Sequence, residues 1–347
     1  MRWLVSRTAP VVLALVVGAV VVATTHANPL DAYAALVQGA FGSLEAVSET
    51  LAQTTVFIFA GAGLAIAFRA GLFNIGAEGQ LVAGALCAAV AGAQLHFPAP
   101  IEVVVCVLAG AGGGAIWASI AGILRARYGA SEVITTIMLN YIAALGANFL
   151  VAGPLRGSAF APETAAIDPA AMLPPLVPGT RLTIAFPFAI VSAIALWWWL
   201  GHSVAGFELR TVGSSERVAR YAGISVPRAI MRAMALSGAL AGLGGACEVL
   251  ALFHRFNAQL SPGYGFTSIA VALLARSNPL GVIASGLFFG VLQNGALSMQ
   301  AQAGISKDLI AIIEGLIILF VSARWIGARL SVRHGGQDAP ATEQLAS

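Results

Sequence analysis

Residues 51–68 read LAQTTVFIFAGAGLAIAF and contain no charged side chain. A bilayer core requires about 20 apolar residues for one spanning helix, so this stretch predicts a transmembrane helix. The whole chain has the same character, since 59% of its 347 residues are hydrophobic and 10% are charged, with a mean hydropathy of +0.87. A soluble domain carries about 25% charged residues. The sequence therefore predicts an all-α polytopic membrane protein and excludes an ordinary cytosolic enzyme or a disordered regulator.

Apolar stretches of comparable character lie on both sides of residues 51–68, and together they predict about ten transmembrane helices. The stretch 265–275 is too short to cross a bilayer without its neighbours. Arg2 and Arg7 precede the first stretch, so that it resembles a signal peptide. A chain with nine further spans can, however, use its first helix as an uncleaved anchor. The predicted spans are 10–25, 51–68, 72–94, 101–124, 131–152, 182–200, 229–252, 265–275, 279–299 and 308–323.

The distribution of Lys and Arg between the loops predicts the orientation. With ten spans and the N-terminus inside, 14 of the 18 Lys and Arg residues fall in cytoplasmic positions and four fall outside. Cytoplasmic loops carry an excess of these residues, so both termini of a multi-pass protein are predicted in the cytoplasm. The outside set is Arg156, Arg181, Arg255 and Lys307.

Residues 1–325 form the predicted membrane domain, with three notable connections and a tail. Residues 28–48 are predicted as an external helix on the membrane surface, with Asn28 as its cap. Residues 153–181 form a Pro-rich external loop, and residues 201–228 form the one substantial cytoplasmic loop. The tail, residues 326–347, is polar and predicted to be disordered.

Glycine is abundant, with 39 residues, many of them inside the apolar stretches. Three pairs have the spacing that lets helix backbones approach closely, and they predict a tightly packed bundle. The pairs are Gly110 with Gly114, Gly238 with Gly242, and Gly286 with Gly290.

The stretch GLFNIGAEGQ at 71–80 places Asn74, Glu78 and Gln80 among apolar residues, with three glycines that weaken a helix. A carboxylate at membrane depth costs about 2.5 kcal/mol or more, and non-helical backbone is tolerated there only inside protein or beside a water-filled cavity. The polar side chains therefore either hold a broken helix together or contact a solute. A second irregular stretch, 261–281, flanks the short run 265–275. In the ten-span prediction 51–152 and 229–323 are candidate inverted repeats.

The other polar residues considered within the predicted spans are Glu132, Asn140, Asn148, Glu248, Gln293, Asn294 and Glu314. Glu132 is close to Arg125 and Arg127, so a structural ion pair is expected. Asn140 and Asn148 lie two helical turns apart, and their face meets either a neighbouring helix or a solute path. Glu248 lies deeper and could meet a polar solute or Asn257.

The cytoplasmic loop carries a short amphipathic pattern. Ser214 is expected to cap a helix with Glu216 in its first turn, and Gly223 is expected to end it. This helix is interpreted as a docking surface for a cytosolic subunit, or as a solvated loop that is basic because of the topology.

Several kinds of chemistry have no motif in this chain. No phosphate-binding Gly-x-x-x-x-Gly-Lys-[Ser/Thr] loop, His-Glu-x-x-His or Gly-x-Ser-x-Gly occurs. The three cysteines lack the spacing of a metal or redox motif, and no basic patch suits nucleic acid. We therefore expect no catalytic residues, no metal site and no cofactor in this chain.

Five stretches, in order along residues 30–325, resemble the permease subunits of bacterial ABC importers of the branched-chain amino acid, sugar and nucleoside group. The resemblance is closest to the permeases of nucleoside importers served by lipoproteins of the basic-membrane-protein type. The stretches are GLFNIGAEGQ (71–80), EVITTIMLNYIA (132–143), GFELRTVGSSERVARYAGI (206–224), SGALAGLGGACEVL (237–250) and GFTSIAVALLARSNPLG (265–281). One local departure is Ser215-Glu216, where the family often has Asn-Pro.

The resemblance implies a multi-pass permease of the bacterial plasma (inner) membrane, surrounded by membrane lipid, that pairs with a second copy or a related permease. A cytosolic ATPase would supply ATP hydrolysis with its own ATP and Mg, and an extracytoplasmic solute-binding lipoprotein would deliver the solute. The loop 206–224 would be the coupling helix, with coupling residues Glu208, Arg210, Glu216, Arg217, Arg220 and Tyr221. Candidates for the translocation path are Asn74, Glu78, Gln80, Asn140, Asn148 and Glu248.

These features predict the membrane subunit of an ATP-driven importer for a nucleoside or a simple-sugar-like solute. The alternative is a stand-alone, ion-coupled secondary transporter. A third class, an intramembrane enzyme, would need a catalytic constellation for which the sequence offers no candidate.

Overall fold

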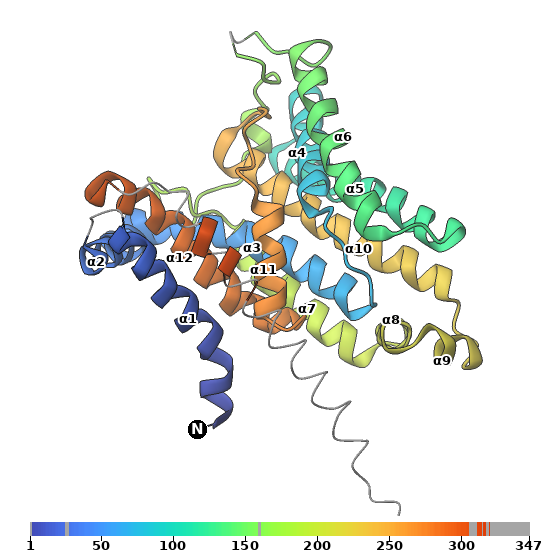
Figure 1. Ribbon diagram of the computed structural model, residues 1–347. Coiled ribbons are helices and arrows are strands. Elements are labelled where there is room, and N and C mark those ends of the chain that lie inside the picture. Colours follow the sequence, from blue (N-terminus) through green and yellow to red (C-terminus); the bar gives the residue numbers. More distant parts are fainter. Residues whose placement is uncertain are drawn as a thin grey trace, which may run out of the picture.

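The computed structural model describes residues 2–24, 28–158, 161–304, 311–313, 315–316 and 319, with side chains from residue 12 onward. This part of the chain is helical and contains no strand, which confirms the all-α prediction (Figure 1). Its α-helices are α1 (Arg2–Thr24), α2 (Pro29–Phe41), α3 (Leu44–Arg69), α4 (Ala77–Gln94), α5 (Ala99–Tyr128), α6 (Glu132–Ala152), α7 (Ala185–His202), α8 (Val204–Ser214), α9 (Glu216–Tyr221), α10 (Val226–Cys247), α11 (Tyr264–Leu274) and α12 (Pro279–Ala303). The described chain also contains two short elements, the 3₁₀ turn η1 (Pro169–Ala171) and the π-helical turn η2 (Glu248–Phe253).

Six helices of the described chain are long and apolar enough to cross a membrane. They are α3, α5, α6, α7, α10 with η2, and α12, and the bent pair of α1 and α2 would make a seventh. The prediction of about ten spans is therefore not confirmed. Helix α4 is polar at its start, α11 has only 11 residues, and most of the predicted span 308–323 lies outside the described residues, as does the tail 326–347.

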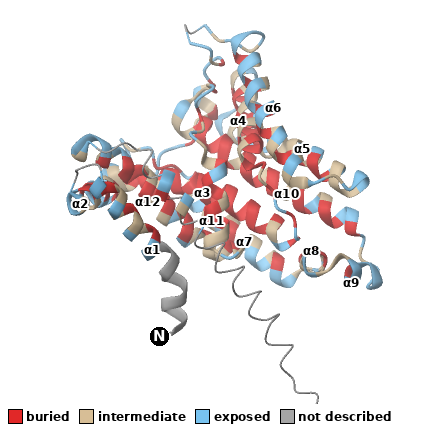
Figure 2. Cartoon of the chain, viewed as in Figure 1, coloured by how far each residue is buried: buried red, intermediate tan, exposed pale blue. Residues whose placement is uncertain are grey.

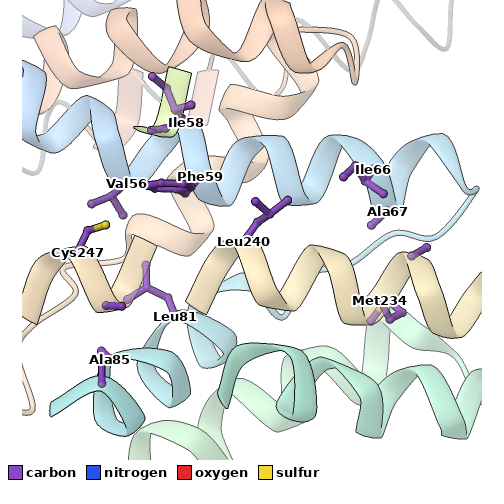
Figure 3. Packing of buried hydrophobic residues seen from close by; sticks show 14 of the residues in the cluster. Val56, Ile58, Phe59, Ile66, Ala67, Leu81, Ala85, Met234, Leu240 and Cys247 are labelled. Carbon is purple, nitrogen blue, oxygen red and sulfur yellow. The ribbon is translucent and has the colours of Figure 1, made fainter. Parts of the chain in front are cut away.

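Helix α3 forms the centre of the bundle. Its most apolar 18-residue window is 89% buried, against 22% for the windows of α5, α6 and α7. Figure 2 shows the same difference, with buried residues concentrated on α3 and α10. Between these two helices Phe59 and Leu240 pack into one apolar layer (Figure 3). Helices α5, α6 and α7 expose large apolar side chains outward, as expected for helices that face lipid.

Three helices meet backbone to backbone through glycine, as the small-residue spacing predicts. A Cβ atom on Gly114 of α5 would lie against the carbonyl oxygen of Gly238 and 2.8 Å from the Cα atom of Gly242, both on α10. Gly84 of α4 and Gly110 of α5 lie against the same Gly242. The prediction of a tightly packed bundle is confirmed here.

Residues of the described loops and helix ends contact one another in two groups. In the first group Arg69 donates a hydrogen bond to the carbonyl of Ser277 at 2.9 Å, and the backbone of Gly213 lies against that of Arg69. In the second, Arg255 pairs with Glu163 in the Pro-rich loop. The backbone of that loop also bonds to residues 250–256, and Arg181 pairs with Glu49 at 3.6 Å.

Helix α2 follows the predicted capping but is shorter than the predicted 28–48. Asn28 caps it by accepting a hydrogen bond from the Leu30 amide, and α3 already begins at Leu44. One face of α2 packs on α12, while Leu30, Val37 and Phe41 are exposed on the other. Both the packed face and the exposed face of α2 are therefore largely apolar, and its position at the membrane surface stays a prediction.

Candidate functional site

The chain between α3 and α4 is a broken segment, residues 70–76, inside the helical bundle. Gly71 begins it with a φ of +77°, a conformation that favours glycine. Non-helical backbone in such surroundings must find hydrogen-bond partners within the protein. Helix α6 supplies them: Glu132 accepts from the Phe73 amide at 3.5 Å, and Thr136 accepts from the Ile75 amide at 3.2 Å.

Asn140 lies one turn further along α6 and serves both sides of the break. Its Nδ2 group donates to the Ile75 carbonyl at 2.9 Å, and its Oδ1 atom accepts from the Gly79 amide at 2.8 Å. Asn140 is buried and therefore joins the end of the broken segment to the first turn of α4.

Asn74 is fully buried at the centre of a second network. Its Oδ1 atom accepts from the Gly76 amide at 2.8 Å and from Gln80 at 3.1 Å. Its Nδ2 group donates to the Gln80 Oε1 atom at 3.1 Å and to the Ser237 hydroxyl of α10 at 3.0 Å. Of the two interpretations that the sequence leaves open, these contacts favour the structural one for Asn74, Gln80 and Asn140, which hold the broken helix together.

Glu78 joins this break to the second irregular stretch. Its Oε2 atom accepts a hydrogen bond from the amide of Gly265, in the first turn of α11, at 2.7 Å. A Cβ atom on Gly265 would overlap the backbone of Glu78 and lie 2.6 Å from the carbonyl carbon of Ala77. The N-terminal turns of α4 and α11 therefore touch, and the carboxylate occupies a place where a helix N-terminus favours negative charge.

Glu248, the first residue of η2, and Gln53 of α3 are both buried. The contact of Gly63 with Ser237 and that of Gly244 with Val56 fix the antiparallel register of α3 and α10. This register brings Gln53 to the level of Glu248. Within the described chain, each of these two buried side chains has an Oε1 atom without a hydrogen-bond partner. Buried polar atoms are rarely left unpaired, so these two acceptors mark where a donor can bind.

The structure places two further candidates, Asn148 and Glu248. Asn140 is buried against α4, whereas Asn148 is exposed, because eight residues at about 100° each turn the helix by about 80° beyond two full turns, so the two side chains do not share one face. Glu248 makes no hydrogen bond with Asn257 in the described structure, where Asn257 accepts from the Gln259 amide, and a polar solute stays the other predicted partner of Glu248.

The predicted cytoplasmic loop contains two helices where the sequence indicated one. Helix α8 extends to Ser214, so Ser215 and not Ser214 caps α9, by accepting from the Val218 amide at 3.4 Å. Gly223, with a φ of +77°, follows the end of α9 as predicted. Val218 and Tyr221 are exposed, and Tyr221 is 87% accessible. The loop therefore presents an apolar patch at the surface.

Ion pairs attach this loop to the bundle. Glu208 of α8 pairs with Arg232 of α10 at 3.0 Å, and Glu216 of α9 pairs with Arg125 of α5 at 3.4 Å. Arg220 pairs with Glu216 on the same helix at 3.3 Å. Arg210 lies within α8 and reaches the Gly201 carbonyl at 3.5 Å, whereas Arg217 is exposed.

The expected pair of Arg125 and Glu132 is confirmed at 3.4 Å. Sequence reasoning missed three other participants, Ser237, Thr136 and Gln53. Each is a neutral polar residue in a largely apolar helix, and such residues give no local signal of their partners. Among the described residues no group of three or more His, Cys, Asp or Glu side chains could hold a metal ion.

The described chain is an all-helical bundle whose broken segments meet between its helices. A loop of two short helices lies against one of these breaks. This arrangement defines a multi-pass membrane protein of the transporter class. The family described as "Branched-chain amino acid transport system / permease component" matches residues 46–322, and the chain belongs to this family. It is therefore a transport permease.

Several characterised permeases are similar over nearly their whole length. The guanosine ABC transporter permease protein NupP of Bacillus subtilis is 37% identical over 91% of this chain and 92% of its own. The glucose ABC transporter permease protein TsgB13 of Haloferax volcanii is 36% identical over 95% of this chain and 91% of its own. The nucleoside ABC transporter permease protein NupB of Lactococcus lactis is 32% identical over 91% of this chain and 90% of its own. These relatives identify the chain as an ABC transporter permease subunit.

Proposed function

We propose that this chain is the membrane-spanning subunit of an ATP-driven importer that moves a nucleoside into the cytoplasm. Similar relatives are named for guanosine and for nucleosides, and one is named for glucose. A simple-sugar-like solute is therefore the second candidate, and both share a ring that carries several hydroxyl groups.

The contact between the α8–α9 loop and the broken segment is the observation that carries this proposal. A Cβ atom on Gly71 would lie 3.0 Å from the Cα atom of Gly213, the penultimate residue of α8. A protein that binds the exposed side of this loop can therefore displace the broken segment by direct contact. We assign that role to a cytosolic ABC ATPase with its own ATP and Mg, and the coupling residues to Glu208, Arg210, Glu216, Arg217, Arg220 and Tyr221.

The path is proposed to run beside the meeting point of α4 and α11. Glu78 and Glu248 are the candidates for direct contact with the solute, because a hydroxylated solute can donate hydrogen bonds to buried acceptors. Asn74, Gln80 and Asn140 are proposed to shape the path, since their polar atoms bond within the protein. Asn148 is exposed on α6, and we keep it as a candidate for the path on a surface that a second permease can cover.

The two groups of loops support ten spans with both termini in the cytoplasm of the bacterial plasma membrane. In this proposed topology the three further spans are α4, α11 and the predicted stretch 308–323, which length and composition alone do not identify. An extracytoplasmic solute-binding lipoprotein would dock on the opposite end, where residues 153–181 and 254–257 pair. The second permease would be the same or a related chain.

Gentle purification from native membranes, followed by mass spectrometry of the proteins that co-elute, tests the proposal. We expect an ATPase in stoichiometric amount, with a second permease or a lipoprotein. A chain that elutes alone and drives uptake in liposomes without ATP would instead be an ion-coupled secondary transporter.

A further inference from the structure

One ridge of α6 bonds to the broken segment and to the first turn of α4. Glu132, Thr136 and Asn140 are spaced by four residues and so lie on the same face of the helix. These three side chains bond to the backbone of residues 73 and 75 in the broken segment and of residue 79 in α4. A movement of the start of α6 can therefore be passed to the broken segment through these bonds.

Arg125, at the end of α5, binds both this ridge and α9. Its Nε atom lies 3.4 Å from Glu132 Oε2, and one of its terminal nitrogens lies 3.4 Å from Glu216 Oε1. The planar guanidinium group can bind two carboxylates at once, which a Lys ammonium group does less well. Glu132 uses its other oxygen for the Phe73 amide, so a continuous chain of polar contacts runs from α9 through Arg125 and Glu132 to the broken segment.

We propose that Arg125 is the positioning residue that transmits movement of α9 to the broken segment. The inference rests on the proposed function, because it requires an ATPase that moves α9. Without the guanidinium group, Glu132 and Glu216 would face each other as like charges, and α9 would lose this connection to α6.

A role in stability alone is the competing explanation. Ion pairs at a protein surface contribute little to stability, and the Arg125 side chain is 32% accessible. Arg127 lies two residues further on, is exposed, and provides a matched control. Replacing either arginine by Gln removes one positive charge from the same end of α5.

The test uses the complex that co-purifies with the chain, reconstituted in liposomes with a nucleoside as the solute. We expect R125Q to lower the amount of solute taken up per ATP hydrolysed by about fivefold or more, the lower range of typical coupling between sites. ATP hydrolysis and thermal stability should stay close to those of the wild type, R127Q should behave as wild type, and R125K should recover only part of the coupling.

A second measurement reports on the broken segment directly. Phe73 is 42% accessible, so a F73C variant in a C87S background can be labelled with a maleimide with and without ATP. We expect the labelling rate to depend on ATP, and R125Q to abolish that dependence.

Three results would overturn the inference. R125Q could keep both the amount of solute taken up per ATP hydrolysed and the ATP-dependent labelling. This result would contradict the role of Arg125 and leave the proposed function intact. R125Q could lose the ATPase from the complex, which would make Arg125 a docking residue. A wild-type complex without ATP-dependent uptake would overturn the proposed function, and the inference with it.

Discussion

The carboxylate of Glu78 accepts a hydrogen bond from the amide of Gly265 at 2.7 Å, across 187 positions of sequence. This bond joins the first turns of α4 and α11, the two helices that begin after irregular stretches. The bond gives Glu78 a structural role. Glu78 is also a candidate for the path, because its carboxylate can accept a hydrogen bond from a solute when α4 moves.

The variant E78Q is expected to weaken this junction while keeping its shape. A carboxylate at a helix N-terminus contributes about 0.3–1 kcal/mol, and up to about 2 kcal/mol when partly buried. Thermal unfolding in detergent should show a loss in this range, together with reduced uptake. E45Q is the control, because Glu45 lies in the first turn of α3 but is exposed. Equal behaviour of the two variants would contradict the assignment of Glu78.

Replacing Asn140 by Ala should destabilise the protein, because the Gly79 amide and the Ile75 carbonyl lose their partner. Each unpaired buried group costs about 1–3 kcal/mol. Asn148 lies on the same helix and is exposed, so N148A should leave thermal unfolding unchanged. If N140A unfolds at the wild-type temperature, the broken segment does not depend on this ridge of α6.

The variant G213A tests the contact between the α8–α9 loop and the bundle. The new methyl group would overlap the Arg69 carbonyl oxygen and lie 2.9 Å from the carbonyl carbon of Ala70. Forcing extra volume into a packed contact costs about 1–3 kcal/mol. We expect lower ATP-driven uptake, whereas G201A, whose methyl group meets open space, should transport normally. Normal uptake by both variants would show that this contact does not carry the coupling.

The close packing of α5 on α10 predicts a strong difference between two glycines of α5. G114V would drive a side chain into the backbone of Gly238 and Gly242, and should reduce folded protein after membrane extraction. G112V points into open space and should extract like the wild type. Size-exclusion chromatography in detergent measures the difference, and similar profiles would contradict the packing seen here.

The helices and the break before α4 were predictable because apolar length and glycine leave strong signals in the sequence. The pair of Arg125 and Glu132 was predictable because the two residues flank one short turn. The third partner, Glu216, was not, since it lies 91 positions from Arg125 and the two residues meet only in the folded chain. Ser237 escaped prediction for the same reason, because the sequence cannot show that it faces Asn74.

The helix boundaries show a similar limit. Ser214 and Ser215 are both good caps by residue type, and the choice between them depends on where α8 ends. Near that end Gly213 lies against the backbone of Arg69, a contact with a distant part of the chain that the local sequence does not show. Asn148 was misjudged because eight residues do not complete a whole number of helical turns.

The central claim is that a separate ATPase drives this permease. The most direct test is uptake of a labelled nucleoside into liposomes that contain the purified complex, with ATP on the side of the α8–α9 loop. We predict accumulation that requires ATP and is insensitive to the collapse of ion gradients. Accumulation without ATP that stops when an ion gradient is removed would contradict the account and identify a secondary transporter.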